Sequence, residues 1–526
     1  MGEQIPPFSI PQMRSWFPEK LRPWFFIPLV IIYQLSGGIY LAAMAEVVGS
    51  LQLRQEDVMY AGYAGLAGMC VVFGIMFRLK FRFAPRFTHL VCCCGIIICN
   101  LITMYVTSVP LLIVTCWVCG IFRMWGTFEC NSTIQLWLTP VRFLPVFFCW
   151  VEALVQCNLC MNGIFSSLVV SFAKWEYLHL GMIFLLLMVM LLVLIFMNDG
   201  KYTPFMKLYG IDWIGAFTWS VTLMALTFVF VYGEHYDWLH SWQIRIASLV
   251  AILLIVSNVY RAKVMRHPWY PNRIFFHRSV WAACLSCVWV NILVSPEHVL
   301  EHLLYDHILG YDEIHATSLN WAVVAGIVTA SFFTLFTFAR RMWSYRVMGT
   351  IALLAITMYL LLMSVSVDYG IPKETMYLPL FCRGFGHTMF GILLLSSLTR
   401  VEFPMFFQSL SVQNSFSAVL GGAIGSAVMA RLLKIKMLAN AALLEINLDN
   451  VNVQAVAKDS VTLYGMVSRL AMLVSIKEIY GMLTIASLFT LVLIMVYCSD
   501  FSLSNIKSFF LCNIYRKNDC GLNNNM

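Results

Sequence analysis

Four ionisable residues lie inside long apolar stretches of this sequence, where charged side chains are otherwise rare. Arg123 and Glu129 share one stretch, Glu152 lies in the next one, and Arg383 lies much later in the chain. A charge near the centre of a bilayer costs a few kcal/mol or more, so charges that remain there usually face a cavity or one another. The chemistry to expect is therefore charge pairing or proton binding within a membrane.

A buried carboxyl group beside an arginine can load and release a proton near neutral pH, because burial favours its neutral form and the arginine favours its charged form. The sequence predicts such a pair between Glu152 and Arg123, which lie on neighbouring apolar stretches. Glu152, Glu129 and Arg123 are accordingly the candidates for proton coupling. The alternative is a static ion pair, or charges at helix ends beside the lipid headgroups.

Polar and aromatic residues on the same stretches predict a water-lined or ligand-lined surface. The candidates for such a cavity are Tyr33, Gln34, Trp125, Asn131, Gln156, Asn158, Asn162 and Arg383. Taken singly, each aromatic side chain is equally compatible with a position in the core or in the lipid.

The composition of the whole chain indicates a membrane protein. Of the 526 residues, 60% are hydrophobic and only 11% are charged, and the mean hydropathy is +0.80. Soluble domains carry about 25% charged residues. The chain is therefore expected to be an all-α polytopic membrane protein without a soluble domain of ordinary size.

Windows of about 19 residues predict fourteen membrane-spanning helices. They cover residues 24–45, 58–77, 87–106, 110–137, 145–172, 179–197, 213–232, 242–260, 280–293, 317–338, 347–365, 376–398, 406–432 and 479–497. Residues 24–197 and 279–497 form two bundles of six helices, and residues 212–260 form an added hairpin that lies outside both bundles. Residues 1–23 and 498–526 are the N-terminal segment and the C-terminal tail.

Lys and Arg are concentrated in the segments that lie on the same side as the two termini, which predicts that both termini are cytoplasmic. One basic connection joins the second and third predicted helices and carries Arg78, Lys80, Arg82 and Arg86. It can anchor the chain to anionic headgroups. It is also a candidate gating loop that pairs with helix ends in one conformation.

Two longer segments are predicted on the outer side. Residues 296–315 contain Glu297 and Glu301, and also His298 and His302, each pair with a spacing that puts both members on one helical face. We expect a solvated acidic helix there, with His298 and His302 as weak candidates for metal ligands. Residues 431–477 mix apolar and polar residues and are expected to form a pair of amphipathic helices that lie at the membrane surface or against a partner.

Several short motifs resemble those of a known family. They are Asp212 to Gly215 at the start of the hairpin, Gly233-Glu234 and Asp237 to Ser241 in its turn, Pro271 to Phe275, Arg383 to Gly386, and Asn414 to Gly425. In order and composition they resemble the fourteen-helix drug:proton antiporters of the major facilitator superfamily (MFS), and most of all the EmrB type of multidrug exporter. In the fifth helix, Asn162-Gly163 and Ser166-Ser167 stand where the family has Gly-Pro followed by paired glycines.

The resemblance implies a secondary transporter of a bacterial inner membrane that exports amphipathic or hydrophobic small molecules by alternating access. Its energy source would be the proton gradient, and no cofactor is expected. A periplasmic adaptor and an outer-membrane channel are the implied partners, with residues 296–315 and 431–477 as contact candidates. The alternatives are an exporter or uniporter of one endogenous metabolite or lipid, and, outside transport, a membrane-embedded enzyme or a scaffold.

Overall fold

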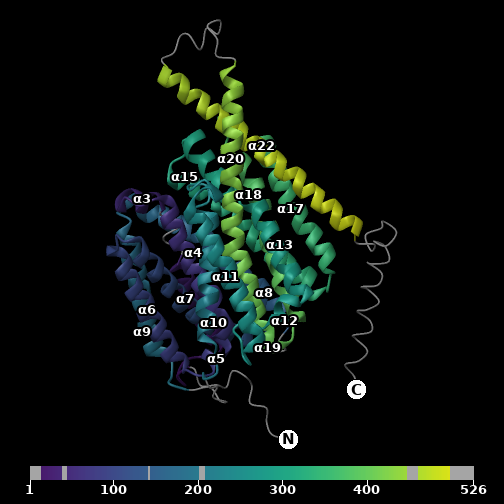
Figure 1. The fold of residues 1–526 in the computed structure, drawn as a ribbon. Helices are drawn as coiled ribbons and strands as arrows, with labels where there is room; N and C mark the ends of the chain where they lie inside the picture. Colours follow the sequence, from purple (N-terminus) through teal and green to yellow (C-terminus); the bar gives the residue numbers. More distant parts are fainter. Residues whose placement is uncertain (1–12, 38–43, 140–142, 201–207, 447–459, 498–526) are drawn as a thin grey trace.

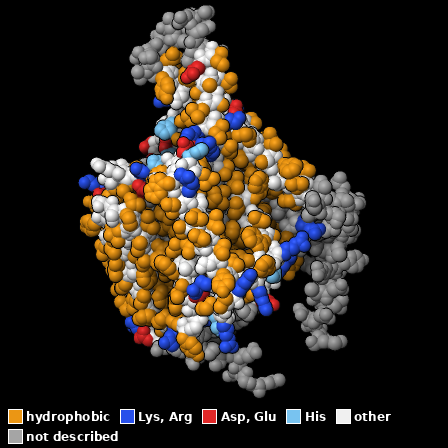
Figure 2. All heavy atoms as spheres, in the orientation of Figure 1, with side chains coloured by type: hydrophobic (Ala, Val, Ile, Leu, Met, Phe, Trp, Pro, Cys, Tyr) orange, Lys and Arg blue, Asp and Glu red, His pale blue; other side chains and the backbone are white. Residues whose placement is uncertain are grey.

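The computed structural model describes residues 13–37, 44–139, 143–200, 208–446 and 460–497. Within these ranges the chain is built of long helices, and an isolated bridge between Met13 and Met197 is the sole β-type pairing. Hydrophobic side chains cover the middle of the visible surface, and the charged side chains gather mainly toward its ends (Figure 2). The predicted all-α membrane fold is confirmed.

The first half of the chain is a bundle in which α7 is central, because α1, α4 and α6 all pack against it. Its helices are α1 (Arg22–Leu35), α3 (Met44–Leu51), α4 (Gln55–Val72), α5 (Met76–Lys80), α6 (Pro85–Tyr105), α7 (Val109–Leu138), α8 (Leu144–Phe172) and α9 (Glu176–Phe196). The added hairpin follows as α10 (Trp213–Val231) and α11 (Trp242–Val264).

In the second half, α18 is central and packs against α16 and α17. The helices are α12 (Asn272–Phe276), α13 (Arg278–Val294), α14 (Pro296–Leu303), α15 (Glu313–Ser318), α16 (Asn320–Thr334), α17 (Tyr345–Ser366), α18 (Glu374–Ser397), α19 (Phe403–Asn414), α20 (Gly422–Glu445) and α22 (Ser460–Tyr497). Three π-helical segments, η4 (Leu304–Ile308), η5 (Leu335–Arg340) and η7 (Ser415–Gly421), continue α14, α16 and α19.

Thirteen helical stretches in the described ranges are long and apolar enough to cross a membrane. They correspond to the second to fourteenth predicted helices. The first predicted helix, residues 24–45, includes residues outside the described part, and α1 accounts for its beginning only as far as Leu35. The rest of the first predicted helix lies partly outside the described residues, so that span stays a prediction.

The predicted outer segment of residues 431–477 is helical in its described part, but its helices are not separate from the neighbouring spans. Most of it continues the flanking helices: α20 extends to Glu445 and α22 starts at Ser460, so the two helices form an arm that projects beyond the bundle (Figure 1). No proline or glycine interrupts residues 431–445, which explains why the helix of the thirteenth span continues past the apolar stretch. We call the end of the molecule from which α20 and α22 project the arm end.

The two halves meet along two interfaces. At the first, the α8 interface, α8 packs against α15, α16 and α18, and the hydroxyls of Ser167 and Thr317 lie 2.8 Å apart. At the second, the α4 interface, α4 packs against α19 and η7 of the other half, and α10 of the hairpin packs against both α4 and α20. The hairpin thus lies outside both bundles, as predicted from the sequence, and its helix α10 packs across the interface where the two halves meet.

Glycines set the close approach of α16 and α18 inside the second half. A Cβ atom on Gly384 would overlap the carbonyl oxygen of Val323, and one on Gly326 would overlap the carbonyl oxygen of Phe381. Small residues at such positions let helix backbones touch in a membrane. This contact fixes the depth and rotation of α18, which carries Arg383.

We therefore expect Gly384→Ala to destabilise the protein by about 1–3 kcal/mol, because the added methyl group must push two backbones apart. The midpoint of thermal unfolding in detergent measures the effect. Gly349→Ala on α17 is the matched control, because no atom would lie within 4 Å of its Cβ. That variant should be at least as stable as the parent, since alanine favours the helix by about 1 kcal/mol over glycine. Equal unfolding midpoints for the two variants would contradict the packing argument.

Candidate functional site

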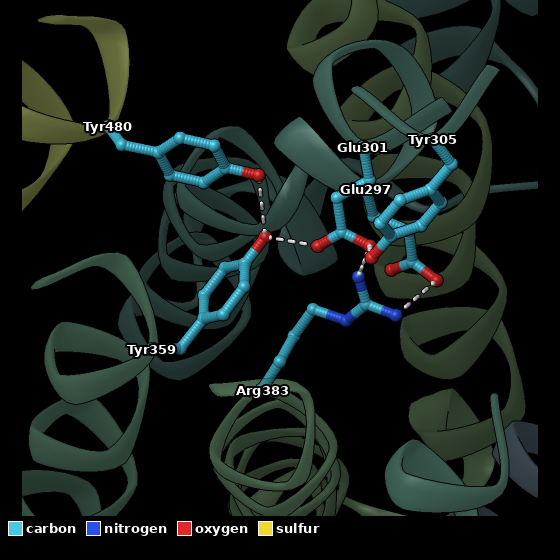
Figure 3. A network of polar contacts seen from close by, with 6 residues as sticks. All are labelled: Glu297, Glu301, Tyr305, Tyr359, Arg383 and Tyr480. Atoms are coloured by element: carbon cyan, nitrogen blue, oxygen red, sulfur yellow. Dashed lines mark hydrogen bonds and ion pairs between the residues drawn. The ribbon is translucent and has the colours of Figure 1, made fainter. Parts of the chain in front are cut away.

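Arg383, in the middle of α18, is paired with two carboxylates although only 2% of the residue is exposed. Its Nη1 donates to Glu301 Oε2 at 2.5 Å, and its Nη2 donates to Glu297 Oε1 at 3.2 Å (Figure 3). Both glutamates lie on α14, one turn apart. The two carboxylates offset the cost of taking the guanidinium charge out of water, which is several kcal/mol.

Three tyrosines complete this network around Glu301. Tyr359 of α17 donates to Glu301 Oε1 at 2.7 Å, and Tyr305 of η4 donates to Glu301 Oε2 at 3.4 Å. The hydroxyl of Tyr480 on α22 lies 3.5 Å from that of Tyr359 (Figure 3). Elements α14, η4, α17, α18 and α22 are thereby tied together inside one half.

The two glutamates differ in exposure. The side chain of Glu301 is 5% exposed and both of its oxygens accept hydrogen bonds, whereas the side chain of Glu297 is 34% exposed and accepts only from Arg383 among the contacts described. Glu301 therefore holds Arg383 in place, and Glu297 presents a more accessible carboxylate beside it.

This arrangement corrects the prediction for residues 296–315. The spacing of Glu297 and Glu301 does put both on one face, but that face points into the protein toward α18 and not into solvent. The reason is that α13 runs on into α14 as one helical stretch, with Pro296 at the start of α14, where its missing N–H is tolerated. The helix thus carries the acidic face to Arg383.

The weak metal candidates do not form a metal site together. His298 is exposed, and Nδ1 of His302 lies 2.8 Å from Asp306 Oδ2 at an exposed position. Among the described residues, no group of three or more His, Cys, Asp or Glu side chains has an arrangement that could hold a metal ion.

A column of polar side chains leads from Arg383 along the α8 interface. Arg383, His387 and Gly391 are spaced by four residues on one face of α18, and His387 lies within electrostatic range of both Glu297 and Arg383. On α8, Cys160 lies close to Glu297 and Arg383, and Glu152 lies against Gly391, where a Cβ would come 2.5 Å from Glu152 Oε1. Gln156 lies between Cys160 and Glu152 along α8, one turn from each.

Glu152 is the member of this column that belongs to the first half of the chain. It is partly buried, its Oε1 accepts from Gln156 Nε2 at 2.9 Å, and it faces the second half across Gly391. Gly391 provides the space for the carboxylate. We call Arg383, His387, Gln156 and Glu152 the interface column.

The predicted pair of Glu152 with Arg123 is wrong. Arg123 points to α1, where its Nη2 donates to the carbonyl oxygen of Gln34 at 2.7 Å and to Gln34 Oε1 at 3.0 Å. Glu152 points the other way, to α18. The rotation of α8 about its axis decides this, and two neighbouring helices in a sequence do not reveal it.

Glu129 also has its partner within the first half. It lies 3.8 Å from Lys80 Nζ, both side chains are almost fully buried, and Lys80 donates as well to the hydroxyl of Ser132. Lys80 is thus not an exposed gating residue. Of the other loop candidates, Arg86 pairs with Asp199 at 2.9 Å and Arg78 is exposed, whereas Arg82 is partly buried and has interactions of its own.

The residues predicted to line a cavity do not share one site in the structure. Gln156 and Arg383 lie in the interface column. Tyr33 is buried within the first half, with its hydroxyl 3.1 Å from His89 Nδ1. The remaining candidates also lie outside the column: Gln34 beside Arg123, Trp125 against Phe83 with ring centroids 5.5 Å apart, Asn131 partly buried on α7, and Asn158 and Asn162 buried on α8.

Sequence reasoning missed Glu297, Glu301, His387 and Tyr359 as interior polar residues. A signal was present for the two glutamates, because the apolar pattern of residues 280–300 continues through Pro296, and a proline at the start of a helix does not end it. No comparable signal marked Tyr359, a tyrosine in an apolar helix whose partner is far away in the sequence.

No family model and no curated protein sequence matches this chain. Solved structures do match it. A peptide transporter, POT, aligns with 15% identity and a TM-score of 0.53 over 92% of this chain and 97% of its own. The human organic anion transporter MFSD10 aligns with 13% identity and a TM-score of 0.52 over 90% of this chain and 100% of its own.

A third solved structure, the MFS proton:xylose symporter XylE, aligns with 11% identity and a TM-score of 0.49 over 87% of this chain and 95% of its own. At such identities the likeness concerns the fold. The chain is thus an all-α, multi-pass membrane protein that shares the fold of these two solved transporters, POT and MFSD10.

The network around Arg383 predicts a large loss of stability when the arginine is removed. Arg383→Met leaves Glu297 and Glu301 without their cation, and we expect a loss of about 3–5 kcal/mol, measured by thermal unfolding in detergent. The double variant Arg383→Met/Glu301→Met should recover part of this loss, because it also removes one of the buried charges.

Arg86→Met is the control, because it breaks the exposed pair with Asp199 and should cost about 1 kcal/mol or less. If Arg383→Met is as mild as Arg86→Met, the network does not stabilise the second half.

Proposed function

We propose that the protein is a proton-coupled secondary transporter that moves amphipathic organic molecules by alternating access, with Glu152 as the proton carrier. The observation that carries the proposal is the position of Glu152, a carboxylate of the first half that lies against Gly391 of the second half. The MFS fold supports transport as the class of activity.

Alternating access moves the two halves relative to each other, so a coupling group needs surroundings that change with this motion. Arg123 and Glu129 have their partners within the first half, in Gln34 and Lys80. Glu297 and Glu301 have Arg383 within the second half. These pairs can travel with their half as fixed units, whereas Glu152 faces the opposite half.

The charge state of Glu152 would affect the stability of the α8 interface. The hydrogen-bond partner described for Glu152 is the neutral amide of Gln156, not a cation. A carboxylate that is covered by protein without a cation is costly, and protonation removes that cost. The protonated form therefore favours the closed α8 interface, and the charged form favours an arrangement in which water reaches Glu152.

The class of substrate and the direction of transport rest on the motifs shared with the EmrB-type exporters. On that basis we propose export of drug-like amphipathic molecules across a bacterial inner membrane, with both termini cytoplasmic. The arm of α20 and α22 would then lie on the periplasmic side, where an adaptor protein could contact it. The polar and apolar side chains of α8 that remain partly exposed, such as Gln156 and Cys157, would face the substrate.

The test is the variant Glu152→Gln in proteoliposomes with an imposed pH gradient and ethidium as the transported dye. We expect the gradient-driven rate to fall by about tenfold or more, because a coupling free energy of a few kcal/mol is worth at least that factor. The remaining transport should no longer depend on pH, since glutamine cannot take up the proton.

Glu402→Gln is the matched control, because this exposed glutamate lies outside the interface column and should transport like the parent. The unfolding midpoints of both variants establish that they are folded. Transport by Glu152→Gln that still follows the pH gradient would remove Glu152 as the proton carrier. If the parent transports the dye at a rate that is independent of pH, proton coupling itself is wrong.

A further inference from the structure

The added hairpin joins the two halves of the chain at the α4 interface. Within the membrane-spanning part, Leu223 of α10 packs in one cluster with Tyr63 and Ala67 of α4 and with Val419 and Ala423 of the second half. Tyr60 of α4 also donates to the carbonyl oxygen of Met224 at 3.1 Å. The hairpin therefore contacts both halves, and its turn lies at the arm end.

The turn is bound to the first half at the start of α4. The hydroxyl of Tyr232 donates to Asp57 Oδ1 at 2.5 Å, and Nη1 of Arg54 lies 2.8 Å from His235 Nε2. His235 Nδ1 also lies 4.0 Å from Glu56 Oε1. Polar contacts to the N-cap residue Arg54 and to Glu56 and Asp57 in the first turn of α4 thus fix the hairpin to this end of the helix.

The same turn is bound to the second half through one carboxylate. Glu234 Oε1 lies 2.7 Å from Lys434 Nζ and 3.3 Å from Arg431 Nη1, both on α20. Its other oxygen, Oε2, accepts from the indole nitrogen of Trp238 at 3.0 Å. Glu234 is therefore held by its own turn while it bridges to α20.

The backbone of the turn is shaped for this role. Asp237 and Trp238 have φ angles of 58° and 55°, in the left-handed region that non-glycine residues rarely adopt. The strain of such residues is about 1 kcal/mol or more each, and it persists only where surrounding contacts require it. In this turn, the left-handed conformation brings the indole of Trp238 back to Glu234.

Partial burial by itself would raise the pKa of Glu234, but hydrogen bonds from Lys434 and Trp238 and the charges of Lys434 and Arg431 hold the pKa below its usual value. A carboxyl group with a lowered pKa stabilises the folded state above its ordinary pKa, and that contribution is lost only as the pH falls through the lowered value. The bridge is thus fully charged at neutral pH, and it is sensitive to salt because its cations are nearly half exposed.

We propose that the turn of the added hairpin is a clasp that holds α4 and α20 together at the arm end, and that it must release Glu234 when the transporter opens at this end. The proposal rests on the alternating-access transport proposed above. It assigns a mechanical role to the hairpin: the α8 interface carries the proton site, and the hairpin governs the opposite interface.

The experiment is hydrogen exchange by mass spectrometry on the full chain in nanodiscs, without substrate, for the variant Glu234→Gln. We expect amide exchange to rise by about threefold to fivefold in the first turns of α4 and around Lys434 of α20, because two partly exposed ion pairs together are worth about 1 kcal/mol. The parent should show a similar rise when the ionic strength is increased, and Glu234→Gln should not respond further.

Glu445→Gln is the matched control, since it removes the same charge from an exposed position on α20 and should exchange like the parent. The charge swap Glu234→Lys/Lys434→Glu should restore protection at least in part. Equal exchange in Glu234→Gln and Glu445→Gln, or no recovery in the swap, would overturn the clasp. The measurement needs neither dye nor pH gradient, so its outcome is independent of whether Glu152 carries a proton.

Discussion

The cost of removing charge from water governs where every ionisable side chain of this protein can lie. Arg383 is the clearest case: it is nearly fully buried in α18, and it is stable there because Glu297 and Glu301 face it and Tyr359 donates to Glu301. Satisfying this single guanidinium draws α14, α17 and α18 together. The close backbone contact at Gly384 and Gly326 then sets the position of α18 against α16.

The same constraint separates fixed charges from charges that can respond to motion. Lys80 with Glu129 lies inside the first half, and Arg383 with its two glutamates lies inside the second. The free energy of such an ion pair does not change when a half moves as a rigid body, because both partners move together. Glu152 lies on one half and contacts the other at Gly391, and for this reason the proposed proton coupling is placed there.

The two interfaces between the halves differ in chemistry. The α8 interface contains a column of ionisable and amide side chains. The α4 interface combines an apolar cluster with a hydrogen bond from Ser411 to the carbonyl oxygen of Cys70, and at the arm end the ion pairs of Glu234 connect the hairpin to α20. The added hairpin is part of this second interface. A hairpin that contacts both halves can restrain their motion, and the clasp at Glu234 would make that restraint reversible.

Composition and hydrophobic periodicity by themselves determined the membrane setting, the all-α fold, thirteen of the spans, the hairpin and the same-face spacing of Glu297 and Glu301. These features depend on local pattern and on the thickness of a bilayer. Only the tertiary structure decided which way each helix faces. Glu297 and Glu301 point to Arg383 and not to solvent, Arg123 binds Gln34 and not Glu152, and α10 of the hairpin contacts both halves. A helix in a uniformly apolar sequence carries little information about its rotation, because its lipid-facing and protein-facing sides are both hydrophobic. Its rotation is fixed by glycine contacts and buried charge pairs whose partners lie far away in the chain.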